Sequence, residues 1–271
     1  MSTATVEAES ETRVVSRAAA KAQPIPMSRI VGVELRTMFD TRSGFWLMAS
    51  IGIAALLATI ATMLFAPDED LTQEAFSAAI GFPMAVILPM IAILSVSSEW
   101  TQRSGLTTFT LVPHRGRVIG AKLIATVAIA VASMVLAFGV GAVGNVVGSA
   151  IAGVDLLWDL TFQDFLLIVL GNVLGMLAGF MLGVVIRNSS GAIVGYFVIS
   201  ALLPSLFMVL ANAQDWFNDV WLWIDFNSAQ GALFEGSPNG TEWAQLGVTG
   251  LAWLVIPMAI GLRVLLRSEV K

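Results

Sequence analysis

Six long apolar runs, separated by short polar connections, are the feature that most limits what this chain of 271 residues can fold into. About 20 consecutive apolar residues make a helix long enough to cross the hydrocarbon core of a bilayer. The runs occupy residues 45–65, 78–96, 118–147, 165–186, 192–211 and 246–266. The sequence therefore predicts an all-α polytopic membrane protein with six transmembrane helices, the third of them longer than the bilayer requires.

The composition excludes a soluble globular protein. Charged residues make up 12% of the chain, against about 25% in an ordinary soluble domain. The chain has no cysteine, which rules out a disulfide framework, a thiolate metal site and a thiol nucleophile.

The basic residues all fall on one side of this six-helix arrangement. All 14 Lys and Arg lie before the first run, in or next to the second and fourth connections, or at the C-terminus. The other three connections have no Lys or Arg and hold these acids: Asp68, Glu69, Asp70, Glu74, Asp155, Asp159, Asp164, Asp215, Asp219, Asp225, Glu235 and Glu242. Because cytoplasmic loops collect positive charge, we expect both termini in the cytoplasm and the chain in the plasma membrane.

Residues 1–26 differ in composition from the rest of the chain. They are rich in Ala, Ser, Thr and Glu and end in a Pro-Ile-Pro break, which predicts a disordered cytosolic tail. Met27 is an alternative start. We expect residues 27–271 to form a single transmembrane domain.

A short amphipathic segment precedes the first apolar run. From Ser28 to Arg42, the apolar residues recur at three- and four-residue spacing beside arginines. This pattern predicts a helix lying along the inner leaflet, with Val31, Leu35, Met38 and Phe39 on its apolar face. The alternative is a cytosolic extension of the first transmembrane helix.

Several kinds of chemistry have no support in the sequence. No phosphate-binding loop is present, so we expect this chain not to hydrolyse ATP, and His114 is the only histidine, so no metal site is predicted. No run carries a charged residue well inside it, whereas ion-coupled carriers and intramembrane hydrolases usually need one. We expect no cofactor on this chain and no enzymatic activity of its own.

The uncharged polar residues and the glycines within the runs are expected to serve helix packing. We expect the polar side chains to bond between helices rather than to contact substrate; they include Asn145, Asn172, Tyr196 and Ser200. Small residues four positions apart allow two helices to pack closely, either within one subunit or between two subunits. This spacing is clearest at Gly171, Gly175, Gly179 and Gly183.

The fifth connection, residues 212–245, is the longest and is rich in aromatic residues: Trp216, Trp221, Trp223, Phe226, Phe234 and Trp243. Tryptophan concentrates at the headgroup level of membranes. The segment predicts short helices in or at the outer leaflet, or, as an alternative, the lining of an exit for an amphipathic substrate.

The second connection reads SEWTQRSGLTTFTLVPHRGRV over residues 98–118. Ser98 is suited to cap a helix, and Glu99 and Arg103 have the spacing of a favourable pair on one helix face. Gly105 and Pro113 then interrupt the helix. The pattern predicts a short cytoplasmic helix with an exposed polar face.

This connection, placed before a long third run, resembles the membrane subunits of type-2 ATP-binding cassette transporters, in particular six-span permeases of actinobacteria. The resemblance extends over almost the whole chain from Met27. In that family the segment docks on the nucleotide-binding subunit. The resemblance therefore assigns docking to Glu99, Arg103, Gly105, Pro113, Arg115 and Arg117.

The same resemblance implies the partners. We expect two copies of a separate ATPase subunit that carry ATP and magnesium, and a second permease copy or a different permease chain, with no nucleic acid. The uncharged runs favour export of a hydrophobic or amphipathic substrate. The alternatives are an ion-coupled secondary carrier and a membrane scaffold or immunity protein that transports nothing. Without a partner, Glu99 and the arginines would serve helix capping and anchoring at the inner surface.

Overall fold

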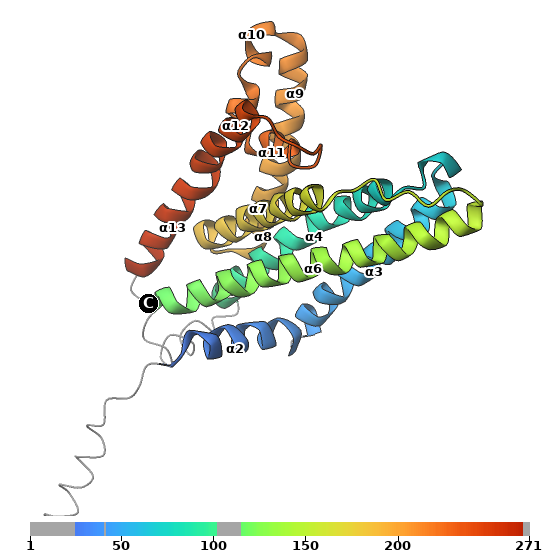
Figure 1. The fold of residues 1–271 in the computed structure, drawn as a ribbon. Coiled ribbons are helices and arrows are strands. Elements are labelled where there is room, and N and C mark those ends of the chain that lie inside the picture. The colour runs from blue at the N-terminus through green and yellow to red at the C-terminus, as the bar shows by residue number, and fades with distance from the viewer. Residues whose placement is uncertain (1–24, 41, 102–114, 268–271) are drawn as a thin grey trace, which may run out of the picture.

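The computed structural model of the chain describes residues 25–40, 42–101 and 115–267. These residues form helices and connecting turns, with no β-strand among them (Figure 1). Six helices are long and apolar enough to cross a membrane, as the sequence predicts. The chain is thus an all-α protein of the multi-pass membrane type.

The first four membrane-spanning segments are single helices, and the last two are composite. After the N-terminal α2 (Met27–Asp40), the four are α3 (Arg42–Phe65), α4 (Gln73–Thr101), α6 (Arg115–Ala152) and α7 (Phe162–Ile186). The fifth comprises α8 (Ser189–Phe197), η2 (Val198–Leu202) and α9 (Leu203–Ala213), and the sixth α12 (Gly240–Gly250), η4 (Leu251–Val255) and α13 (Ile256–Arg267). Short turns complete the chain: η1 (Asp68–Asp70), α10 (Asp215–Asn218), η3 (Trp221–Trp223) and α11 (Phe226–Gly231).

The helices extend several residues beyond the apolar runs because polar caps satisfy their first backbone N–H groups. The sixth segment begins at Gly240 rather than 246, since the Asn239 side chain accepts hydrogen bonds from the N–H groups of Thr241 and Glu242. The Glu242 carboxylate in turn accepts from the Asn239 N–H, at 2.8 Å, which completes a capping box.

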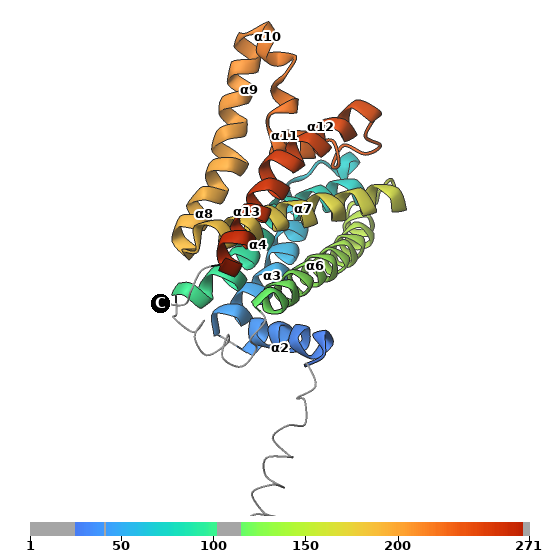
Figure 2. The same cartoon turned by 90° about the vertical axis from the view of Figure 1, so that its left-hand side faces the viewer.

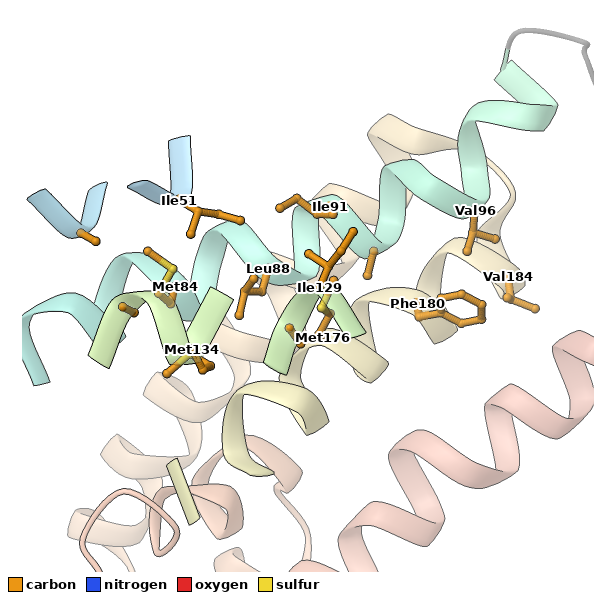
Figure 3. Packing of buried hydrophobic residues seen from close by; sticks show 14 of the residues in the cluster. Ile51, Met84, Leu88, Ile91, Val96, Ile129, Met134, Met176, Phe180 and Val184 are labelled. Carbon is orange, nitrogen blue, oxygen red and sulfur yellow. The ribbon is translucent and has the colours of Figure 1, made fainter. Parts of the chain in front are cut away.

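The core of the protein lies where α3, α4, α6 and α7 pack together. Figure 3 shows the side chains that fill it, with α4 in the middle of the group. Met84, Leu88 and Val96 of α4 are fully buried there. They meet Ile129 of α6 and Phe180 of α7.

The glycines of α7 bring it close to α4. A Cβ atom on Gly179 would lie 2.6 Å from the carbonyl oxygen of Pro89, and one on Gly183 would lie 3.2 Å from that of Ile93. At Gly179 only a residue without a side chain fits without a shift of the backbone, and at Gly183 a side chain would be tightly packed. At these two positions, the glycine spacing therefore serves packing within the subunit.

Prolines in the last two segments are preceded by π-helical turns. Proline has no N–H and its ring clashes with the carbonyl four residues earlier, so the α-helical hydrogen bond to that carbonyl is lost. Pro204 follows η2 and Pro257 follows η4, and both η2 and η4 are π-helical. α4, by contrast, continues through Pro83 and Pro89 as one helix.

Side chains from other elements satisfy two of the carbonyls that these prolines leave without a donor. The Tyr196 hydroxyl donates to the carbonyl of Ala85, four residues before Pro89, at 2.9 Å. Asn227 Nδ2 donates to the carbonyl of Ser200, four residues before Pro204, at 3.2 Å. Polar groups in membrane helices commonly compensate for proline in this way.

The basic residues within the described ranges gather at one end of the molecule. Both views place α2, the starts of α3 and α6, the α7–α8 junction and the end of α13 at this end, which we call the basic end (Figures 1 and 2). The fifth segment rises away from the other helices toward the opposite end, and only 6% of its most apolar stretch is buried.

The N-terminal helix α2 packs directly on the protein. Leu35 and Met38 lie against the core cluster, as their spacing predicts, and Val31 is half-buried. Phe39, which the same spacing places on the apolar face, is 50% exposed because it lies on the side of α2 that faces away from α6 and α3.

Candidate functional site

Two regions hold the residues that could carry function: the basic end, where the predicted docking segment begins and ends, and a pocket between the fourth, fifth and sixth segments and α11. Of the predicted docking residues, Arg103, Gly105 and Pro113 lie outside the described residues. The backbones of Glu99 and Arg115 belong to the end of α4 and the start of α6, which lie near each other at the basic end (Figure 1).

Arg117 is the docking candidate whose side chain the structure describes. Its guanidinium donates a hydrogen bond to the carbonyl of Ile25, just before α2 begins. The side chain therefore joins the start of α2 to the first turn of α6. This contact gives Arg117 a structural role that the sequence did not predict.

A second link between α2 and α6 is a buried ion pair. Lys122 Nζ lies 2.6 Å from Glu34 Oε2, and the two side chains are 6% and 10% exposed. Buried charges are stable only when they are paired with good geometry. By contrast, the Arg36–Asp40 pair on the same helix lies on the surface.

The sequence contained a signal for this pair. Glu34 follows Ile30 by four residues and precedes Met38 by four, so it lies on the apolar face of α2. A carboxylate on such a face needs a cationic partner. Lys122 is the basic residue that α6 places there, although by sequence it counts among the loop charges.

The pocket lies between the fourth, fifth and sixth segments and α11. It holds about 420 Å³, including the space at its mouth. The residues that line it are Gly175, Ala178, Tyr196, Ile199, Ser200, Leu203, Asp225, Phe226, Asn227, Gln230 and Trp253.

Asp225 supplies the one carboxylate of this lining. The residue is 4% exposed, and it caps α11 through Oδ2, which accepts from the Ser228 N–H at 3.0 Å and from the Ser228 hydroxyl. Oδ1 accepts no hydrogen bond within the described part of the chain. Half of the carboxylate is thus left without a partner.

Other hydrogen bonds hold the surrounding side chains in place. Gln230 Nε2 donates to the carbonyl of Gly171 at 2.7 Å, which attaches α11 to α7. Trp253 Nε1 donates to the carbonyl of Ile224 at 2.7 Å, which attaches η4 to the turn before Asp225.

Both π-helical turns border the pocket. Ile199 and Ser200 belong to η2, and Trp253 belongs to η4. Such turns are frequent at functional sites, because the extra residue in the turn redirects neighbouring side chains. The two prolines are evident in the sequence, but the pocket beside their π-helical turns is not.

Asp225 forms no ion pair with any basic residue in the described part of the chain. The chain contains no Lys, Arg or His between Arg187 and Arg263, and α7 has none either. The lining therefore combines one carboxylate with uncharged polar groups, aliphatic side chains and three aromatic residues.

Metal-binding clusters are not found in the described residues: no group of three or more His, Cys, Asp and Glu side chains is close enough to hold an ion.

The polar residues that were expected to bond between helices differ in their contacts. Asn145 Nδ2 donates to the carbonyl of Leu157 at 2.7 Å and Tyr196 bonds to α4, whereas Asn172 bonds within its own helix. Ser200 lines the pocket. In comparisons with protein-family models and with curated proteins, the chain matches none.

Proposed function

We propose that this chain is the permease subunit of an ATP-driven exporter in the plasma membrane, with hydrolysis on two separate ATPase subunits. The observation that carries the proposal is the construction of the basic end. The connection between α4 and α6 begins and ends there, beside α2. In the proposed orientation this end faces the cytoplasm, where an ATPase is available.

The links between α2 and α6 support a mechanical role for this end. The Glu34–Lys122 pair and the Arg117–Ile25 hydrogen bond fasten α2 to α6. A force applied to residues 102–114 by a closing ATPase would therefore move the start of α6 together with α2. Because α4 packs along α7, the same force would reach the fourth segment.

The exposed fifth segment supports pairing with a second permease chain. Its side chains Leu206, Met208 and Val209 are all more than half exposed. In the proposed assembly, the fifth segments of two copies or of two different permeases face each other, and a hydrophobic or amphipathic substrate passes between them.

Charge reversal tests the docking role. The tagged chain is expressed in its native host and purified in mild detergent, and the amount of any ATP-binding cassette ATPase that co-purifies is measured. We expect Glu99→Arg and Arg115→Glu each to lower ATPase recovery at least tenfold, because like charges across an interface cost several kcal/mol. Membrane levels of the permease should stay near those of the parent chain.

Arg263→Glu is the matched control, since Arg263 is an exposed basic residue at the same end but outside the α4–α6 connection. Equal loss of ATPase with all three variants would indicate a general charge effect. Normal recovery with Glu99→Arg and Arg115→Glu would contradict the docking role, as would the absence of any co-purified ATPase.

One observation favours the ion-coupled carrier as the second candidate. Asp225 is a buried carboxylate beside two transmembrane segments, the kind of group that carriers use to bind protons or sodium. Transport by the purified chain alone in vesicles, driven by an ion gradient and abolished by Asp225→Asn, would favour the carrier over the permease.

A further inference from the structure

We infer that the pocket between α7, the fifth and sixth segments and α11 is a binding site for a lipophilic organic ammonium ion. The inference goes beyond the proposed function, because it concerns binding by this chain alone and requires no ATPase. It rests on the charge, the lining and the construction of the pocket.

The charge of the pocket selects a cation. Asp225 carries the one formal charge on the lining, its Oδ1 has no hydrogen-bond partner in the described residues, and no basic residue lies between Arg187 and Arg263 in the sequence. A buried carboxylate is stabilised by an opposite charge. Here the protein supplies none, so a ligand can supply it.

The lining selects an organic cation rather than an inorganic one. Hard metal cations are usually held by six or more oxygen ligands. This pocket offers a single carboxylate among Ala178, Ile199, Leu203 and aromatic side chains. Aromatic residues attract ammonium groups through their ring electrons, and the aliphatic residues suit an apolar body.

The uncharged polar groups add acceptors for an N–H donor. Asn227 and Gln230 each use their side-chain nitrogen to bond a backbone carbonyl, which leaves their side-chain oxygens as acceptors.

The pocket is built in advance of any ligand. Trp253 is fixed by its bond to Ile224, and Tyr196 by its bond to Ala85. Asp225 is held by Ser228. Binding therefore needs little ordering of the side chains, which is the condition for useful affinity in a small site.

Thiol protection tests the inference. Ser200→Cys introduces a single cysteine into the pocket of a chain that has no other. The full-length variant is purified in detergent, and its alkylation rate by N-ethylmaleimide is measured with three probes of similar shape: 2-phenylethylammonium, 3-phenylpropan-1-ol and 3-phenylpropanoate. We expect the ammonium ion to slow alkylation at least fivefold at saturation, and the anion to have no effect.

Asp225→Asn in the same background tests the carboxylate. Asparagine also caps helices well, so the fold should be retained. We expect the concentration of 2-phenylethylammonium that gives half-protection to rise at least tenfold. Asp215→Asn, which removes a charge from an exposed residue of the same connection, should leave it unchanged.

Three results would overturn the inference: no protection by the ammonium ion, equal protection by the alcohol or the anion, or full protection of the Asp225→Asn variant. Protection by sodium chloride equal to that by the ammonium ion would assign the pocket to an inorganic cation instead. If Asp225→Asn fails to fold, the comparison of the three probes on Ser200→Cys still decides the question.

Discussion

Glu34 and Lys122 are the residues whose environment differs most from what their charge suggests. Both side chains are almost excluded from solvent and contact each other at 2.6 Å. Removing one member of such a pair leaves a buried charge without compensation, whereas removing both leaves none. Replacing one residue of the pair should therefore destabilise the protein more than replacing both, which is not expected for a surface pair.

We expect Lys122→Met to lower the free energy of unfolding by about 3–5 kcal/mol. Glu34→Met combined with Lys122→Met should recover most of this loss. The measurement is an SDS titration of the purified chain in mixed micelles. Arg36→Met is the control, since its pair with Asp40 is exposed and worth about 0–1 kcal/mol. A Lys122→Met chain as stable as the control would contradict the assigned role of the pair.

Tyr196 and Pro89 should be energetically coupled. The Tyr196 hydroxyl replaces the donor that Pro89 cannot give to the carbonyl of Ala85. Tyr196→Phe should therefore lower stability by about 0.6–2 kcal/mol in the parent chain. In the Pro89→Ala background, residue 89 has its own N–H, and the same substitution should have little effect.

The double-mutant cycle measures this coupling by the same SDS titration. Equal effects of Tyr196→Phe in the two backgrounds would show that the hydroxyl does not serve the proline carbonyl. The cost of replacing Pro89 itself cancels, because Pro89→Ala and the double variant Pro89→Ala/Tyr196→Phe both carry that substitution.

At the scale of elements, α4 and α7 make the most extensive helix contact among the described residues. We expect Gly179→Ala to lower the free energy of unfolding by about 1–3 kcal/mol, because the added methyl group would lie 2.6 Å from a backbone oxygen that cannot rotate away. Gly139→Ala has nothing within 4 Å of the new atom and should be neutral or slightly stabilising. Indistinguishable unfolding curves for the two variants would contradict this account of the α4–α7 contact.

The sequence predicts the elements better than their contacts. Six apolar runs were enough to locate the six segments, because a bilayer demands a minimum length of apolar helix. Short helices were also expected in the fifth connection from its aromatic residues, and α10 and α11 lie there.

The pocket could not be predicted, because its lining comes from positions as far apart as Gly175 and Trp253. The length of an apolar run does not indicate which other segments it contacts. The π-helical turns depend on how the chain accommodates Pro204 and Pro257. The aromatic fifth connection did indicate this region, since Phe226 was among its residues and lines the pocket.

At the scale of the whole molecule, the separation of charge predicts orientation. We expect cysteines placed at Asp70 and Asp219 to react with an impermeant thiol reagent added outside intact cells. Cysteines at Ser190 and Arg263 should react only after the membrane is opened. All four positions are exposed, so differences in labelling report the side of the membrane. The reverse labelling pattern would invert the orientation and with it the proposed docking role.

The order of the elements along the chain has a consequence for biosynthesis. The four helices of the bundle end at Ile186, so most of the core can pack before the sixth segment, which adds Leu265 to it, has been made. The fifth segment follows: α8 packs against α4 and α7, whereas α9 keeps an exposed apolar surface that suits it to lipid. The pocket needs residues from both sides of this division, so it closes only when translation has passed Trp253.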